Sequence, residues 1–171
     1  VMQLKEKLHL DAINVKCQYE FSKEYAMTMC VPLSLAADSG VLTSCEGDTM
    51  CTVSMMMLAY LSNQVVAYGD SINHSGNLLK LSPCGYMPYS LGTGVREITN
   101  FMPGCGFSGI QNSFVMKPGR VTVLRLIEDV GGYHIVYLTG TGVDTKPRQG
   151  YMPALDVAPD NGMAGLIEHY S

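Results

Sequence analysis

Charged residues are scarce in this chain. Of its 171 residues only 15% are Asp, Glu, Lys or Arg, 47% are hydrophobic, and the net charge is -4. The basic residues are scattered, which argues against nucleic acid or an anionic membrane surface as a partner. A surface with so little charge is apolar, and we expect another domain or subunit to cover part of it.

Membrane spans, secretion signals and zinc motifs are also missing. No apolar run reaches the roughly 18 residues that a membrane-spanning helix needs, and no signal peptide is recognisable. The six cysteines include no CxxC pair, and no cluster of His and Cys has zinc spacing. We therefore expect a cytoplasmic protein with reduced thiols, the alternative being disulfides.

The patterns that are present predict an α+β protein of one large or two small domains. Up to residue 90, helical and strand-like patterns alternate, which is typical of an α/β unit. Strand-like runs separated by turn residues then follow at 95–102, 109–116, 121–128 and 133–138. We predict an α/β segment over 1–90 and a small antiparallel β-barrel-like domain over 91–171.

The most informative stretch is Cys45–Asp48, which precedes a Met-rich helix predicted over 49–62. Residues 64–68 then read as a strand that ends just before Asp70. Glu46 thus lies before a helix and Asp70 after a strand, where loops of an α/β fold collect ligand-binding groups. We expect the two carboxylates to converge.

Each acidic residue also has a purely structural alternative. Glu46 and Asp48 could each serve as an acid at a helix N-terminus, with Asp48 as the N-cap. Asp70 could be a turn residue, because residues 71–77 are polar and predict a loop. From the residues alone these alternatives stay open.

Four histidines could supply a third functional side chain beside the carboxylates of Glu46 and Asp70. His9 ends an amphipathic helix and indicates a surface position, whereas His74 follows Asp70 closely and could line the same site. His134 lies within a strand pattern, where a core or sheet position is the default. His169 lies near the end of the sequence.

Two carboxylates and one neutral imidazole suit a divalent metal ion. Oxygen-rich ligation with one nitrogen favours Mn²⁺ or Mg²⁺ over zinc. Such a metal polarises a carbonyl and holds the adjacent hydroxyl, while a nearby carboxylate moves a proton at the neighbouring carbon. This is the chemistry of an aldose–ketose isomerase that acts through an enediol.

A series of segments occurs in a recognisable order. The series is Val15–Cys17, Cys30–Asp38, Cys45–Asp48, the Met-rich helix, Gly69-Asp70 and Ser82–Pro88. It resembles the L-fucose isomerase and L-arabinose isomerase family, and is similar to the C-terminal part of L-fucose-isomerase-like proteins. The resemblance covers most of residues 11–90, and residues 95–171 match more loosely, as the β-barrel region of that family.

The resemblance implies oligomers whose active sites use neighbouring subunits. It implies Mn²⁺, or another divalent cation, bound by Glu46, Asp70 and a late histidine, with His169 as the first candidate and His134 as the second. Glu46 and Asp70 would also be the catalytic acid–base pair. We take Glu46 as the base, because its loop before a helix gives it a fixed position.

On this basis we expect the C-terminal part of a metal-dependent aldose–ketose isomerase of the L-fucose/L-arabinose type, acting on a monosaccharide as a homo-oligomer. We expect this part to be inactive alone.

Lys16 and Asn77 could contact sugar hydroxyls. Pro83 stands where some family members carry a histidine, which bears on the substrate. The alternatives are a non-catalytic sugar-binding or assembly domain with the same fold, and a metal-dependent lyase or epimerase.

Overall fold

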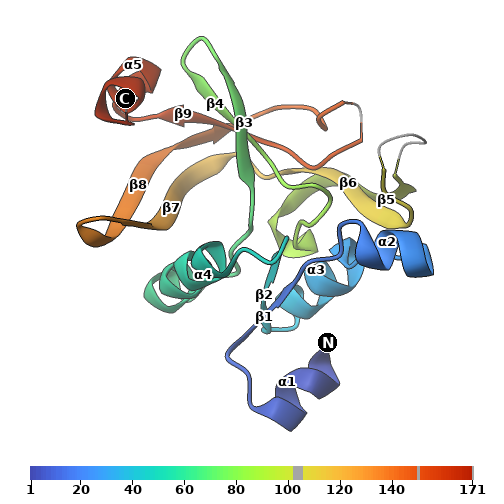
Figure 1. The fold of residues 1–171 in the computed structure, drawn as a ribbon. Coiled ribbons are helices and arrows are strands. Elements are labelled where there is room, and N and C mark those ends of the chain that lie inside the picture. Colours follow the sequence, from blue (N-terminus) through green and yellow to red (C-terminus); the bar gives the residue numbers. More distant parts are fainter. Residues whose placement is uncertain (102–105, 150, 171) are drawn as a thin grey trace.

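The structure is a computed structural model that describes residues 1–101, 106–149 and 151–170, with only the backbone described for 168–170. The chain runs from short helices around a pair of parallel strands into antiparallel sheets (Figure 1). This α+β architecture, with an α/β segment first and antiparallel strands after it, confirms the fold class predicted from the sequence.

The N-terminal part is built on two parallel strands joined by two helices. Its elements are α1 (Met2–Leu8), β1 (Ala12–Val15), α2 (Glu20–Tyr25), α3 (Cys30–Asp38), β2 (Leu42–Cys45) and α4 (Thr49–Ser62). The Met-rich helix is confirmed as α4. Leu33, Met55 and Tyr86 are buried in one core cluster between these elements, and each such side chain contributes about 1.5–3 kcal/mol by leaving water.

The C-terminal part is a five-stranded sheet with the order β3-β4-β9-β8-β7, beside a separate antiparallel pair, β5 and β6. A second core, which includes Leu79, Leu155 and Met163, lies between this sheet and α5. The strand patterns predicted after residue 90 are confirmed as β5 to β8. The elements are β3 (Asp70–Ser75), β4 (Leu78–Ser82), a short 3₁₀ helix (Tyr89–Leu91), β5 (Gly92–Asn100), β6 (Ile110–Met116), β7 (Gly119–Asp129), β8 (Gly132–Val143), β9 (Leu155–Pro159) and α5 (Gly162–Tyr170).

The chain on either side of Asp70 differs from the sequence-based prediction. Residues 64–68 form no strand: within the described ranges they join no ladder, and Val66 packs against the N-terminal core instead. Residues 71–77 form no simple loop, because most of them belong to the β3–β4 hairpin. β3 is an edge strand with all of its residues exposed. It therefore lacks the alternation of apolar and polar residues that identifies a strand.

The two parts of the chain meet where β7 lies beside α4 (Figure 1). The backbone N–H of Leu126 donates to Ser54 Oγ at 2.7 Å. The C-terminal sheet also takes in β3 and β4 from before residue 90, since β4 pairs with β9. The division into 1–90 and 91–171 stays a prediction. Among the helices of the described ranges, none is long and apolar enough to cross a membrane.

Candidate functional site

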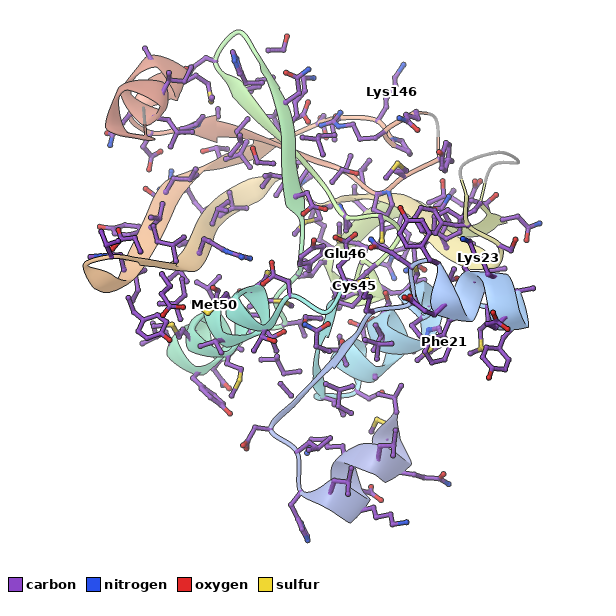
Figure 2. The ribbon with its side chains drawn as sticks, in the orientation of Figure 1. Phe21, Lys23, Cys45, Glu46, Met50 and Lys146 are labelled. Carbon is purple, nitrogen blue, oxygen red and sulfur yellow. The ribbon has the colours of Figure 1, made fainter. Side chains whose placement is uncertain are left out.

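Glu46 follows β2 directly and has an unusual backbone conformation. Its φ is 68°, in the left-handed region, and that of Gly47 is 76°. This conformation costs a side-chain-bearing residue about 1–2 kcal/mol. Asn14 holds the turn from β1: its Oδ1 accepts the Gly47 N–H at 2.9 Å, and its Nδ2 donates to the Asp48 carbonyl at 2.8 Å. Figure 2 shows Cys45 and Glu46 at this junction between β2 and α4.

Asp48 is the N-cap of α4, which is the structural role considered for it in the sequence. Its Oδ1 accepts the Cys51 N–H at 2.8 Å, which satisfies a helix donor that otherwise lacks a partner. Its Oδ2 accepts a hydrogen bond from Arg125 Nη1 at 2.6 Å. Burial alone would raise the pKa of Asp48, but these two donors hold it below its usual range. Asp48 is therefore a structural anchor for the loop that carries Glu46.

The carboxyl groups of Glu46 and Asp70 meet at one hydroxyl group. The Tyr68 hydroxyl lies 2.9 Å from Glu46 Oε2 and 2.7 Å from Asp70 Oδ1. The structure thus brings together the two acids that 24 positions separate in the sequence. A hydroxyl has one hydrogen and can donate to one carboxylate at a time. The second contact is satisfied when that carboxyl is protonated or when a cation shares the site.

The pKa values of both acids are raised. Burial, together with Cys84 and Asp70 nearby, raises the pKa of Glu46 to about 7, against the opposing hydrogen bond from Tyr68. Burial also raises the pKa of Asp70, and again the Tyr68 hydrogen bond opposes it. The Tyr68 hydroxyl keeps its proton, because burial and the two carboxylates raise its pKa as well. A bound cation would relieve this concentration of negative charge.

A group of thiols lies behind Glu46. Cys45, the preceding residue, is fully buried, and its Sγ lies 3.9 Å from that of Cys84. Cys84 is half-buried and also interacts with the Glu46 carboxyl. All five cysteines of the described ranges are free thiols, and Cys105 lies outside these ranges.

The histidine candidates lie elsewhere or have no described side chain. His169 belongs to α5, and its side chain lies outside the described part of the structure. His134 lies near the tip of the β7–β8 hairpin, with Nε2 3.0 Å from Asp129 Oδ1. His74 lies on the exposed strand β3 and lines a shallow groove against α5. None of these placements tests the predicted third ligand, His169.

The two residues considered for sugar contacts occupy different places. Lys16 lies beside the site loop, since a Cβ at Gly47 would approach Lys16 Cβ to 3.2 Å, and its Nζ is 3.8 Å from Glu20. Asn77 lies in the β3–β4 turn, where its Oδ1 accepts the Met163 N–H at 2.8 Å. Asn77 therefore supports the start of α5.

Two carboxylates suit a hard divalent cation by their chemistry, because oxygen ligands are what Mn²⁺ and Mg²⁺ prefer. Across the described residues, no group of three or more His, Cys, Asp or Glu side chains is arranged to hold a metal ion. Glu46 and Asp70 are thus two candidate ligands, and the binding of a metal ion by them and His169 stays a prediction.

Sequence analysis missed three residues that organise the site: Asn14, Tyr68 and Arg125. The position of Tyr68 could have been recognised from the sequence. Tyr68 stands two residues before Asp70, and residues two apart on an extended chain share a face. Arg125 lies 77 positions from Asp48, and Asn14 34 positions, so neither contact had a local signal.

No protein-family model matches the chain. It is similar to curated proteins named sulfoquinovose isomerase. Identity is 30% over 146 residues with the protein of Alkalicoccus urumqiensis and 29% over 140 residues with that of Priestia megaterium. The alignments cover 82% and 80% of this chain but 32% and 31% of those proteins, so the chain spans about a third of their length. The chain is therefore similar to one section of proteins that are isomerases by name.

Proposed function

We propose that this chain is the active-site-bearing section of a metal-dependent aldose–ketose isomerase of the L-fucose/L-arabinose isomerase type. The observation that carries the proposal is the pair of half-buried carboxyls, Glu46 and Asp70, held at the Tyr68 hydroxyl. The names of the curated relatives support the isomerase reaction. The proposal covers the whole polypeptide, of which this chain is one section.

In this proposal Glu46 and Asp70 bind Mn²⁺ or another divalent cation, with His169 as the third ligand. When bound, the metal polarises the sugar carbonyl and the adjacent hydroxyl. Glu46 would accept the proton from C2 of the open-chain aldose and deliver a proton to C1 after exchange with solvent, while the O2 hydroxyl proton moves to O1, so that the aldose becomes the ketose through the enediol. Its pKa of about 7 in the cation-free site suits a group that both takes and gives a proton near neutral pH.

The substrate in this proposal is a monosaccharide. Sulfoquinovose is the first sugar to test because the relatives carry its name, and L-fucose and L-arabinose follow from the family resemblance. Arg125, paired with Asp48, and Lys16, beside Gly47, place two cationic side chains next to the Glu46–Asp48 loop. Both are exposed, with 42% of the Arg125 side chain and 54% of the Lys16 side chain accessible, so they can meet polar groups of a sugar.

A second candidate is a sugar-binding or assembly domain without catalysis. One observation favours it: Pro83, which stands where some members of the family that the chain resembles have histidine, is buried. This candidate predicts sugar or partner binding without metal-dependent turnover.

The test is ketose formation by the intact protein from sulfoquinovose, L-fucose and L-arabinose, with Mn²⁺ and then with a chelator. Ketose that forms with metal and stops with chelator supports the isomerase and identifies its sugar. Absence of turnover on these aldoses while Mn²⁺ still binds would favour the lyase or epimerase. Absence of metal binding would favour the domain without catalysis.

A further inference from the structure

Four cysteines from four separate segments meet beside the candidate site. Cys17 follows β1, Cys30 begins α3, Cys45 ends β2 and Cys84 follows β4. Within this group the sulfurs of Cys45 and Cys84 lie within hydrogen-bonding distance of each other, at 3.9 Å. The first three are buried, with at most 3% of each residue exposed, and Cys84 is partly accessible.

The surroundings of Cys84 differ from those of a cysteine that only fills space in a core. A single buried cysteine behaves as a small apolar residue. Cys84 instead contacts Cys45, at 3.9 Å between the sulfurs, and lies near enough to the Glu46 carboxyl to raise its pKa. The next residue, Gly85, is pressed against Cys30, because a Cβ at Gly85 would lie 2.9 Å from the Cys30 sulfur. The segment after β4 is thus packed directly onto the thiols.

We propose that Cys45 and Cys84 are a redox pair that forms a reversible disulfide when a peroxide reaches the site. The sulfurs are already in contact at 3.9 Å, and Cys84 is the partly accessible member. Cys45 is enclosed, so it serves as the resolving thiol.

The oxidation proceeds in two balanced steps. The Cys84 sulfur attacks hydrogen peroxide, the O–O bond breaks, and a sulfenic acid and one water form. The Cys45 sulfur then attacks the Cys84 sulfur, the S–O bond breaks, the S–S bond forms, and a second water leaves. Two thiols are oxidised by two electrons while one peroxide is reduced to two waters. A dithiol reductant reverses the reaction.

The disulfide draws the two sulfurs from 3.9 Å to about 2.05 Å. Cys45 is bonded to Glu46, and Cys84 lies near the Glu46 carboxyl, so we expect the movement of the two sulfurs to shift that carboxyl. A displacement of about 1 Å at a reacting group can cost about 10²-fold in rate. This consequence rests on the proposed function, whereas formation of the disulfide does not.

The first experiment maps disulfides in the intact protein after brief exposure to hydrogen peroxide. A chymotryptic digest without reductant separates Cys30 from Cys45, since Leu33 and Leu35 lie between them. We expect a Cys45–Cys84 linked peptide that disappears on reduction with dithiothreitol. Free thiols throughout, or a Cys30–Cys84 link in its place, would overturn the proposal.

Two cysteine variants test whether the linked peptide depends on Cys84. Cys84→Ser should abolish the linked peptide, and the matched control Cys51→Ser should leave it at the unmodified protein's level, because the Cys51 thiol interacts with Arg125. Loss of the link in Cys51→Ser would contradict the pairing. The map of the unmodified protein decides the question if Cys84→Ser does not fold.

A second measurement tests the effect on Glu46. Where the protein forms ketose, oxidation should lower the rate about 10²-fold, and dithiothreitol should restore it. An unchanged rate with the disulfide formed would overturn the link to Glu46. A protein without any isomerase activity would contradict the proposed function and leave the peptide map as the test of the disulfide.

Discussion

Glu46 has a left-handed backbone conformation, with φ at 68°, that glycine adopts more easily than glutamate. Its carboxyl is half-buried, and burial raises its pKa to about 7, so the charged form is disfavoured there. Asn14 and Asp48 hold the loop in place despite these costs. A residue that is unfavourable in both backbone and side chain fits a role in function better than a role in stability.

Replacement of Glu46 by glycine should separate these two roles. Glu46→Gly removes the left-handed strain and the half-buried carboxyl, so we expect the free energy of unfolding to rise by about 1 kcal/mol. Ketose formation should be lost in the same variant. Urea denaturation and the turnover assay measure the two effects.

Glu46→Gln is the companion variant, because it keeps a side chain of the same length in the strained conformation. It should lose activity with a smaller gain in stability than Glu46→Gly. A lower stability in both variants would contradict this account and indicate that Glu46 is a structural residue.

At the scale of elements, Asp48 holds the first turn of α4 through two different contacts. Asp48 caps the helix through the Cys51 N–H and binds Arg125 from β7. Since Arg125 and Asp48 have 42% and 31% of their side chains exposed, solvent weakens the ion pair, and exposed pairs contribute only up to about 1 kcal/mol. The cap is therefore the larger of the two contributions.

Substitutions at Asp48 should distinguish the cap from the ion pair. Asp48→Ala removes both and should lower the free energy of unfolding by about 1–2 kcal/mol. Asp48→Asn keeps a good capping side chain and should cost only about 0.5 kcal/mol. Equal losses in the two variants, measured by thermal or urea unfolding, would mean that the ion pair dominates.

Secondary structure could be predicted from the sequence where an element has a local hydrophobic pattern, and could not where that pattern is missing. The Met-rich run predicted α4, and alternation predicted β7 and β8, because burial on one side leaves a periodic signal. β3 left none, since its side chains are all exposed and only its backbone pairs. The convergence of Glu46 and Asp70 was predicted from their places before the Met-rich helix and after a strand over 64–68, and the structure brings the two together although residues 64–68 form no strand.

At the scale of the whole molecule, one side of the β7–β8 hairpin presents large apolar side chains to solvent. Tyr133, Ile135 and Tyr137 alternate along β8 and are 66%, 49% and 65% exposed. Side chains two apart on a strand share a face, so the three form one stripe. This stripe agrees with the scarcity of charge in the sequence, and a homo-oligomer or a further section of the polypeptide that covers it stays a prediction.

The candidate site is also a property of the whole molecule. The loop after β2 supplies Glu46 (Figure 2), the segment after α4 supplies Tyr68 and Asp70, and β7 supplies Arg125. Only folding brings these segments together, which is why Arg125 could not be assigned from the sequence.

The most direct measurement is isomerisation in D₂O by the intact protein with Mn²⁺, compared between Glu46→Gln and Glu24→Gln. Glu24 is an exposed glutamate on α2 and serves as the matched control. We expect the unmodified protein and the control to form ketose with deuterium at C1, and Glu46→Gln to be slower by about 10²–10⁴-fold. Turnover of Glu46→Gln at the rate of the control would contradict the assignment of Glu46 as the base.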